Sequence, residues 1–420
     1  MKVATFRGMR AIVLEFSLLR AGLTLLLSKL SKSAYYSAFS IVKYYQDYPE
    51  PRLPAEDWVK VRTKLCGICG SDVRLITLSE SFYLYPRVSF PLIPGHEVVG
   101  VVEEVGKDVK DLQPGDRVVL DPALPCRVRR LELCEACKKG HFAVCHNTDI
   151  GVISPGIFTG TCRDTAGGWA EFFVAHESQL IKLPNSVGDE NAIFAEPLTI
   201  GIHSALRAFP TEAQRVAIVG CGVIGLMTIS ALRHLGFSGE IIGIERNERL
   251  VEIAKRFGAN EVIVGDPIDE VAKLIGGRVY KPPRGQRVLV GGGIDVVFEC
   301  VGTAEAVDTA LRIAKPLGKV VIAGTVSETR LDLAPIFSKE LEVLGTFGCG
   351  YEELGSERRR TFDIAIEILE NRDFSELLTH VFSLEEYKKA LWSAINKKES
   401  KAIKVAFKFE KFRDKVYKRI

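Results

Sequence analysis

Residues 216–225 read Val-Ala-Ile-Val-Gly-Cys-Gly-Val-Ile-Gly, and this stretch decides the fold of the second half of the chain. Its first four residues are all apolar, as in a short strand that is buried on both faces of a parallel sheet. The glycines form the motif G-x-G-x-x-G directly after that strand, where a helix is expected to begin. Gly220 permits a tight turn, Gly222 lets a pyrophosphate approach the backbone, and Gly225 allows close packing of helix on strand. The stretch therefore predicts a doubly wound α/β domain that binds a dinucleotide.

The acidic residue after the next apolar run indicates which dinucleotide is bound. Residues 241–244 form that run, and Glu245 follows it, 20 positions after Gly225. A carboxylate there accepts hydrogen bonds from the adenosine ribose and repels a 2′-phosphate, which favours NAD. Arg246 could instead accept that phosphate, so NADP stays a second candidate. The helix N-terminus would offer its free N–H groups to the phosphates. The predicted cofactor contacts are Gly220, Gly222, Val223, Ile224, Gly225, Glu245 and Arg246.

In the rest of the chain, the pattern of apolar runs and turn signals changes at two points. Up to about Pro197, turn signals separate short β-branched runs, which predicts a mostly β domain. After it, apolar runs alternate with helical stretches, and one helix is expected to be capped by Asn247 and to end at Gly258. The tail from about Gly345 contains two helical stretches and a strand-like run, and we expect it to return to the first domain. The expected domains are residues 1–197, 198–345 and 346–420. The expected strands outside the glycine motif include 9–15, 58–61, 98–105, 117–120, 295–298, 319–323 and 403–407.

The composition is that of an ordinary soluble globular protein, with 47% apolar and 26% charged residues. A length of 420 residues exceeds one ordinary core, so two domains are expected. The net charge of +3 gives no reason to expect nucleic acid or a membrane as partner. The apolar run 18–30 is shorter than the roughly 20 residues that span a bilayer. It also carries Arg20 and Lys29, and Glu15 interrupts the apolar stretch before it, against a signal peptide. We expect a buried or subunit-facing helix there, in a cytoplasmic protein.

Four cysteines close together in the sequence predict a structural metal site. Cys126, Cys134, Cys137 and Cys145 are separated by 8, 3 and 8 positions. Four thiolates at such spacing suit tetrahedral zinc with no open position. Buried or unpaired loop cysteines are the alternative, and polar neighbours such as Lys138 argue against burial. We therefore expect a zinc lobe at about 126–145.

A second group of metal-ligand residues lies in the first half of the chain. Cys69 is followed by Ser71 and Asp72. Residues 95–106 read Gly-His-Glu-Val-Val-Gly-Val-Val-Glu-Glu-Val-Gly, and Pro-Gly-Asp-Arg-Val follows at 114–118. With the glycine motif and the four-cysteine lobe, the chain resembles the zinc-containing medium-chain dehydrogenase/reductase family over nearly its whole length. The resemblance implies an α/β protein with a GroES-like β-rich catalytic domain and a Rossmann domain, an active site between them, and a homodimer or homotetramer.

The resemblance also implies the catalytic metal ligands. Cys69 and His96 match the catalytic zinc ligands, and Glu97 matches a carboxylate that can approach the metal. Glu196, before Pro197, matches the metal-side carboxylate of the sorbitol, threonine and glucose dehydrogenase branches, which acts directly or through water. The chain lacks the Cys that liver-type alcohol dehydrogenases carry near this point, which favours polyol-like or sugar-like substrates.

The implied activity is transfer of a hydride from a secondary alcohol, polyol, sugar or amino-alcohol hydroxyl to NAD(P)+. Zinc with an open position lowers the pKa of bound water to about 7, and should acidify a bound alcohol likewise. Ser71 matches the first hydroxyl of the family's proton relay, and Asp72 would orient His96. Many relatives carry a His five positions after the ligand Cys. Here that position is Arg74, so the proton exit is expected to differ.

Two alternatives stay open at this point. One is a zinc-free quinone or enone reductase of the same superfamily, although such relatives lack the two ligands Cys69 and His96. The other is a non-catalytic zinc protein that senses NAD. Insertions near residues 18–48 and 266–291 lengthen the chain. Within the added regions, Lys43–Tyr45 and Arg127–Arg130 are candidate subunit contacts.

Overall fold

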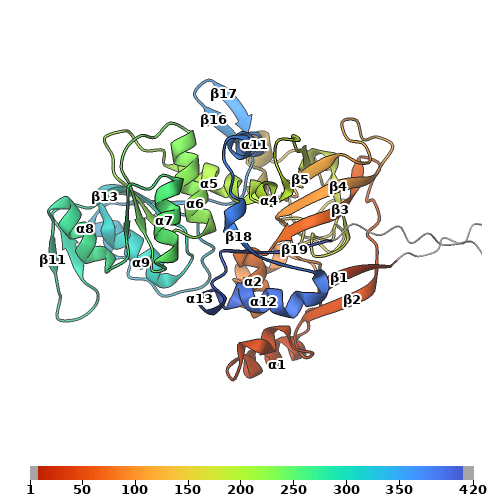
Figure 1. Cartoon of the computed structure of the whole chain (residues 1–420), viewed down its shortest axis with the longest axis horizontal. Helices are drawn as coiled ribbons and strands as arrows, with labels where there is room; N and C mark the ends of the chain where they lie inside the picture. The colour runs from red at the N-terminus through yellow and green to blue at the C-terminus, as the bar shows by residue number, and fades with distance from the viewer. Residues whose placement is uncertain (1–7, 410–420) are drawn as a thin grey trace, which may run out of the picture. The chain divides into compact units, whose positions relative to one another are not determined.

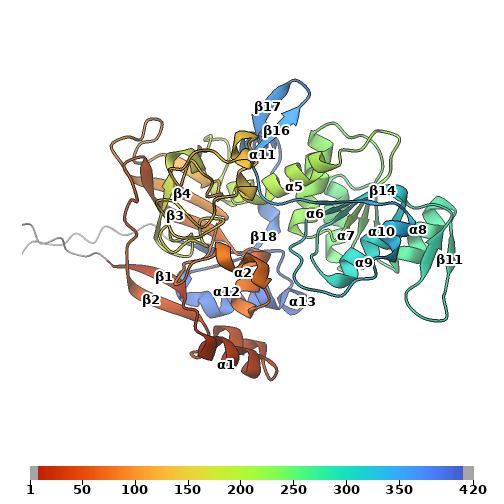
Figure 2. The same ribbon diagram turned by 180° about the vertical axis from the view of Figure 1, so that it is seen from behind.

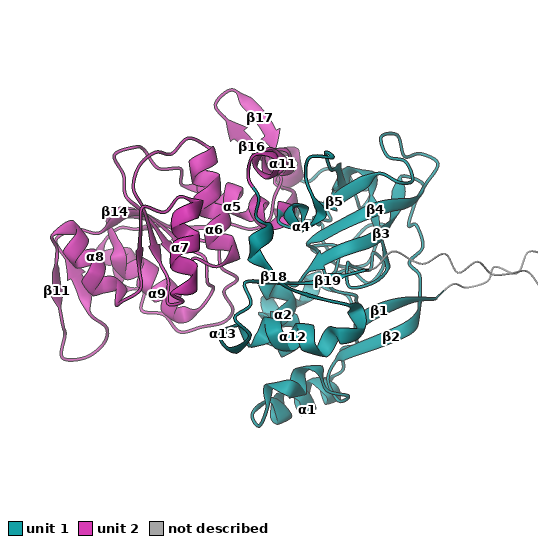
Figure 3. Ribbon diagram, in the orientation of Figure 1, with its two compact units in different colours: residues 1–134, 145–194, 373–420 teal, residues 135–144, 195–372 magenta. Residues whose placement is uncertain are grey.

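The computed structural model describes residues 8–409, which form two compact units. Unit 1 holds residues up to 134, residues 145–194 and residues from 373 onward, and unit 2 holds residues 135–144 and 195–372 (Figure 3). The stretch 346–372, which the sequence groups with the C-terminal segment, therefore lies in unit 2.

Unit 2 is built on a six-stranded parallel sheet in the order β10-β9-β8-β13-β14-β15; its strand β13 is labelled in Figure 1. With β8 counted as the first strand, this is the order 3-2-1-4-5-6 of a doubly wound dinucleotide-binding domain. The order reverses between β8 (Val216–Val219) and β13 (Ile294–Glu299). All four residues of β8 are buried, as the apolar run predicts. The Rossmann domain is thus confirmed.

The helices of this unit form groups that pack beside the sheet (Figure 2). Helices α6 and α7 contact each other, and α8, α9 and α10 form a second group. Gly258 ends α7 as predicted, but the N-cap residue is Glu248, one position after Asn247. The Asn247 side chain still accepts a hydrogen bond from the Arg249 N–H at 3.2 Å. The other elements of unit 2 are α3 (Glu135–Lys138), η3 (Phe142–Val144), α5 (Ala195–Arg207), α6 (Val223–His234), β9 (Ile241–Ile244), α7 (Arg249–Phe257), β10 (Glu261–Ile263), α8 (Pro267–Ile275), β11 (Arg278–Tyr280), β12 (Val288–Val290), α9 (Ala304–Ile313), β14 (Ala314–Ile322), α10 (Ala334–Ser338), β15 (Glu342–Gly345), β16 (Tyr351–Leu354), β17 (Glu357–Arg360) and α11 (Thr361–Asn371).

Unit 1 is built on a seven-stranded sheet in the order β18-β19-β3-β4-β5-β7, with β6 paired to β3. Its central strand β3 (Trp58–Gly67) runs antiparallel to β4 (Val98–Val105) and to β19 (Lys404–Lys408). The C-terminal tail therefore completes the sheet that the first part of the chain begins. Long, alternating or wholly apolar strands meet in one large buried core, as expected for a GroES-like domain.

The remaining elements of unit 1 surround this sheet. A two-stranded antiparallel ribbon, β1–β2, carries the first described residues. These elements are β1 (Gly8–Leu14), α1 (Leu18–Ser28), η1 (Lys32–Tyr36), β2 (Val42–Pro49), α2 (Gly70–Thr77), η2 (Phe82–Arg87), β5 (Arg117–Leu120), β6 (Phe172–His176), η4 (Glu177–Gln179), β7 (Leu180–Lys182), α4 (Asp189–Ala192), η5 (Ser375–Leu377), β18 (Leu378–Phe382), η6 (Leu384–Glu386), α12 (Tyr387–Ile395) and α13 (Lys397–Ser400).

One carboxylate ties two strands of this sheet to the following helix. Asp189, at the start of α4, accepts a hydrogen bond from Arg117 at 2.8 Å and forms an ion pair with Lys64. Burial by itself would raise the pKa of Asp189, but the two cations outweigh it and hold that pKa below its ordinary value. The contact links β3, β5 and α4.

The N-terminal run forms the expected helix, but the first of its two expected placements, burial within its own unit, is wrong. Helix α1 is not buried: most of its leucines are exposed, and its buried residues are Ala21 and Thr24. In the described part of the chain, no helix is both long and apolar enough to cross a membrane. The run 18–30 therefore leaves an apolar surface that its own unit does not cover.

Candidate metal and dinucleotide sites

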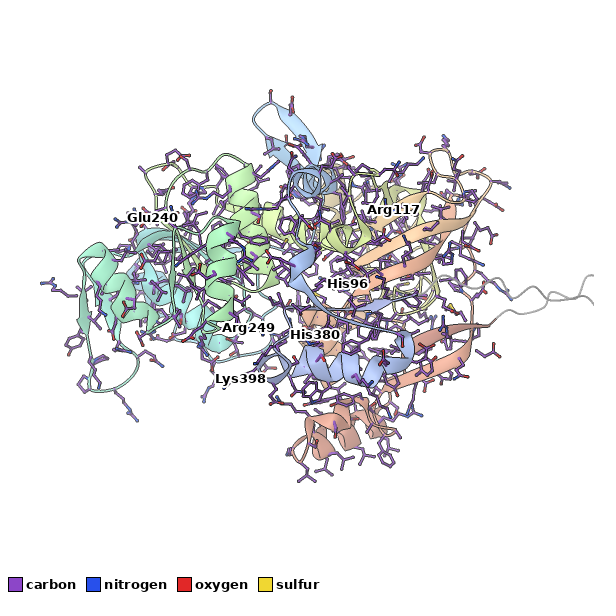
Figure 4. All side chains as sticks on the ribbon, in the orientation of Figure 1. His96, Arg117, Glu240, Arg249, His380 and Lys398 are labelled. Carbon is purple, nitrogen blue, oxygen red and sulfur yellow. The ribbon has the colours of Figure 1, made fainter. Side chains whose placement is uncertain are left out.

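The pairing of β3 with β4 brings the first group of metal-ligand residues together. Cys66 lies opposite Val98, so Cys69, just after β3, and His96, just before β4, lie at the same end of the strand pair. The ligand atoms of Cys69, His96 and Glu97 all lie within 4.8 Å of one another (His96 is labelled in Figure 4). A thiolate, an imidazole and a carboxylate so arranged fit a zinc ion.

The Asp72 carboxylate contacts both Cys69 and His96. Its side chain accepts a hydrogen bond from the Cys69 N–H at 2.9 Å, which fixes the start of α2. Its other oxygen lies 3.6 Å from Nδ1 of His96. Burial raises the pKa of Asp72, while the neighbouring His96 opposes that shift. The carboxylate is thus placed to orient the imidazole through Nδ1.

The Glu97 carboxylate has a partner that the sequence did not suggest. Glu97 and Lys404 form an ion pair in which both side chains are almost fully buried. The carboxylate lies so close to the backbone that a Cβ on Gly67 would come within 2.0 Å of it. Lys404 is far away in sequence but reaches this point because β19 pairs with β3. Glu97 therefore lies between a cation and the two other candidate ligands.

The other residues discussed in the sequence lie on two helices: Ser71 and Arg74 on α2 of unit 1, and Glu196 on α5 of unit 2. Ser71, the second residue of α2, is half-buried, and Arg74 lies in the last turn of the same helix. Glu196 is buried in the first turn of α5, which belongs to unit 2. Its participation with Cys69 and His96 stays a prediction. His203, further along α5, donates to or accepts from Glu352 at 2.8 Å, consistent with a structural histidine.

The four cysteines of the lobe converge, including the distant Cys126. All four sulfurs lie within 4.8 Å of one another, with 3.5 Å between Cys126 and Cys145 and 3.9 Å between Cys134 and Cys145. Tetrahedral zinc with bonds of about 2.3 Å would place its sulfurs about 3.8 Å apart, so the group fits zinc. The expectation from Lys138 and other polar neighbours was wrong on burial: Cys126, Cys137 and Cys145 are buried, since the charged side chains point outward while the loop closes over the sulfurs.

Arg129 organises this lobe and was not predicted as a core residue. The run Arg127–Arg130 was expected to be a candidate subunit contact. For Arg129 this expectation is wrong, because its side chain is fully buried. Its guanidinium donates hydrogen bonds to backbone carbonyls of Leu124, Ile150, Ile153, Ser154 and Gly156. Burial lowers the pKa of Arg129, although nearby thiols oppose this. Two loops beside the cysteines are thereby joined by one side chain.

The glycine motif has the geometry that a dinucleotide needs. Gly220 has a φ of +91°, which favours glycine. A Cβ on Gly225 would lie 2.0 Å from the Gly220 carbonyl oxygen, so α6 packs tightly on the turn. A Cβ on Gly222 would meet nothing within 4 Å, which leaves room for a phosphate beside the backbone. Val223 and Ile224 form the first turn of α6, whose N–H groups face outward at this end.

Glu245 lies beside this loop at the end of β9. It accepts a hydrogen bond from the Cys221 N–H at 2.8 Å and, through its other oxygen, from the N–H groups of Arg246 and Asn247. A carboxylate has about four acceptor positions, so three are used in the protein itself. The carboxylate is fixed next to the glycine motif, where a ribose is expected.

Comparisons with known proteins agree with this geometry. Residues 55–185 match the alcohol dehydrogenase GroES-like domain, and residues 223–370 match the zinc-binding dehydrogenase domain. The chain is 33% identical to L-idonate 5-dehydrogenase of Vitis vinifera over 350 residues, which is 81% of this chain and 85% of that protein. This chain belongs to the zinc-containing medium-chain alcohol dehydrogenase family.

Further relatives of this zinc-containing dehydrogenase are similar over most of their length. Galactitol 1-phosphate 5-dehydrogenase of Escherichia coli (strain K12) is 30% identical over 302 residues, 71% of this chain and 78% of that protein. The solved structure of a zinc-binding dehydrogenase from Sinorhizobium meliloti 1021 bound to NADP superposes with a TM-score of 0.68 at 25% identity, covering 96% of this chain and 99% of that one. The predicted family, fold class and enzyme class are confirmed, with zinc and NAD(P) as the cofactors of the class. The relatives support a dehydrogenase over the reductase and the non-catalytic alternatives.

Proposed function

We propose that this dehydrogenase oxidises the secondary hydroxyl of a polyol, a sugar or a related alcohol, with NAD as the electron acceptor. The observation that carries the proposal is the convergence of Cys69, His96 and Glu97 within 4.8 Å. The two relatives above are named for L-idonate and galactitol 1-phosphate. Both compounds are polyhydroxylated, which supports this substrate class.

The proposed catalytic metal ligands are Cys69 and His96, with Glu97 or Glu196 as the carboxylate on the metal side. Zinc, when bound, would act as a Lewis acid that makes the substrate hydroxyl more acidic, and NAD+ would take up the hydride. Lys404 competes for Glu97 through their buried ion pair. As a ligand, Glu97 would have to share its carboxylate between the metal and Lys404, so Glu196, directly or through water, stays the alternative ligand.

The residues of the chain have distinct tasks in this proposal. The substrate carbon loses a hydride, with its two electrons, and the hydroxyl loses its proton. Ser71, two residues after Cys69 on the same turn, would receive that proton and pass it on. Asp72 would hold the imidazole of His96 in one orientation. With Arg74 where many relatives have histidine, we propose that the proton leaves Ser71 through water or the cofactor ribose.

The other predicted sites complete the proposal. Cys126, Cys134, Cys137 and Cys145 would hold a structural zinc ion, for which their separations are suitable. The glycine motif and the first turn of α6 would bind the pyrophosphate. Glu245 would accept from the ribose and repel a 2′-phosphate, so NAD is preferred to NADP.

We also propose where the enzyme acts and how it assembles. The enzyme would be cytoplasmic, would form a homodimer or homotetramer, and would have neither nucleic acid nor membrane as partner. The catalytic domain would comprise the GroES-like part and the C-terminal segment, and the dinucleotide domain would lie between these two parts in the sequence.

The test combines metal analysis with a substrate panel. We expect about two zinc ions per chain and NAD reduction with at least one of the polyols, aldoses, simple secondary alcohols or L-threonine. Cys69→Ala should abolish turnover, lower the zinc content to about one, and leave NAD affinity nearly unchanged. Cys66→Ala, which removes a neighbouring buried thiol outside the ligand set, is the control and should remain active. Turnover by Cys69→Ala at the wild-type rate would overturn the proposed metal centre.

A further inference from the structure

Helix α1 exposes most of its leucines to solvent and does not pack them against its own unit. The side chains that face the unit are Ala21 and Thr24, and the Thr24 hydroxyl is fully buried. In contrast, Leu18, Leu19 and Leu30 are 83%, 84% and 87% exposed. Surface helices normally bury their apolar stripe and expose polar residues. We call the exposed set the leucine surface, which consists of Leu18, Leu19, Leu23, Leu25, Leu26 and Leu30.

Aromatic residues extend this surface beyond the helix. Phe82, Tyr83 and Tyr85 of the short helix η2 are also exposed. Phe16, immediately before the N-cap of α1, connects the two groups, because its ring centroid lies 6.2 Å from that of Tyr85. The helix itself lies at the periphery of unit 1 in both ribbon views (Figures 1 and 2). The apolar residues thus belong to one neighbourhood of one unit.

The leucine surface and the three exposed aromatic residues of η2 together have about the size of one side of a protein–protein interface. Burial of a leucine side chain removes roughly 60–120 Å² of apolar area from water, and burial of an aromatic side chain roughly 150–250 Å². Weighted by their exposure, the six leucines and three aromatic residues present roughly 550–1,000 Å². Stable interfaces bury about 800 Å² per partner, whereas exposed patches on monomers are usually smaller.

The charges around the helix favour a second copy of the same chain as the occupant. Arg20 is already paired with Glu15 at 2.9 Å, and α1 contains no acidic residue. The exposed Lys29 and Lys32 lie at the C-terminal end of the helix, so most of the surface carries no charge and can face its own copy. A helix that lies on a membrane needs a polar face rich in Lys and Arg, and the opposite face of α1 is instead packed against its unit through Ala21 and Thr24.

We propose that the leucine surface pairs with the leucine surface of a second copy of this chain about a two-fold axis, and so forms a subunit interface. A surface that is apolar throughout is self-complementary, as an isologous contact requires. The inserted helix would then serve assembly. The inference does not depend on which alcohol the enzyme oxidises.

The experiment measures the mass of the full-length protein in solution by light scattering and sedimentation. The double variant Leu19→Lys/Leu26→Lys places two charges in the interface and should halve the mass relative to the wild type. Because both leucines are exposed in the single chain, the melting temperature of the dissociated chain should hold and turnover per chain should change less than twofold. Tyr280→Lys, on the separate hairpin β11–β12, is the matched control and should keep the wild-type mass.

A second measurement needs no variant. Hydrogen exchange of the α1 amides in the wild type should slow as the protein concentration rises through the dissociation range. A monomeric wild type, or a double variant with the wild-type mass, would overturn the proposal. Sedimentation of the wild type, but not of the double variant, with vesicles of phosphatidylglycerol and phosphatidylcholine would assign the surface to a membrane instead.

Discussion

Substitution of Arg129 by methionine keeps most of the length of the side chain but removes the group that joins the loops of the cysteine lobe. The guanidinium lies 2.7–3.3 Å from the five carbonyl oxygens that accept its hydrogen bonds. Each buried acceptor left without a donor costs about 1–3 kcal/mol. Removal of the buried charge offsets part of that cost. We expect a net loss of about 3–5 kcal/mol, the range for disruption of a buried charged contact.

This loss should appear in two measurements on the zinc-loaded protein. A change of 1 kcal/mol shifts the melting temperature of a domain of this size by about 2–4 °C, so the melting temperature of unit 1 should fall by roughly 6–20 °C. Release of zinc to a chelating dye should also become faster, because the loops over the sulfurs loosen. Both effects follow from the same broken contacts.

The neighbouring arginine supplies a matched control. Arg130 carries the same group, but it is half-exposed and pairs with Asp57 at 3.0 Å on the surface. Such pairs contribute about 0–1 kcal/mol, so Arg130→Met should lower the melting temperature by only a few degrees and leave zinc release unchanged. Equal shifts in the two variants would refute the assignment of Arg129 as the residue that holds the lobe.

Three further predictions concern the dinucleotide domain and the acid stability of unit 1. Gly222→Ala should weaken NAD binding at least tenfold without changing the melting temperature of the free protein, because its Cβ meets only open space. Gly225→Ala should lower both the NAD affinity and the melting temperature. Equal melting temperatures of the two variants in calorimetry would contradict this distinction. Glu245→Gln should narrow the preference for NAD over NADP, measured as the ratio of kcat/KM values, and an unchanged ratio would remove Glu245 from cofactor selection. Asp189 has a lowered pKa, so its stabilising effect is full above its ordinary pKa and is lost as the pH falls through the folded value. Asp189→Asn should therefore destabilise the protein at pH 7 by about 1–2 kcal/mol, with a difference in urea unfolding that shrinks as the pH falls from 5 toward 3.

The parts of the structure that depend on short stretches of sequence could be predicted from local patterns. The apolar run before Gly220 and the glycines after it specify a strand, a turn and a helix, each of which depends on its own residues. The spacing of the four cysteines is equally local, since a loop of 20 residues can close on itself. These features, and the family resemblance, were sufficient for the two architectures.

The residues that sequence reasoning missed all depend on distant pairing or on the direction of a side chain. Lys404 meets Glu97 only because β19 adds to β3, more than 300 positions away in the chain. Arg129 looks like a surface residue in a run of arginines, and only the closed loop shows that backbone carbonyls surround it. The run 18–30 predicts a helix, but the sequence does not reveal that its unit covers the side of Ala21 and Thr24 and leaves the leucines exposed.

The strand pairing of unit 1 has a consequence for how the protein is made. The Ile68 N–H, one residue before Cys69, donates a hydrogen bond to the Val405 carbonyl at 2.8 Å, so the segment that bears the first metal ligand is anchored by a strand synthesised more than 300 residues later. Domains generally fold as units during synthesis. Most of the dinucleotide domain precedes β19 in the sequence and can fold first, while the ligand-bearing sheet stays incomplete until β19 has been synthesised. A nascent chain lacking only β19 should therefore already bind NAD and yet be unable to oxidise an alcohol.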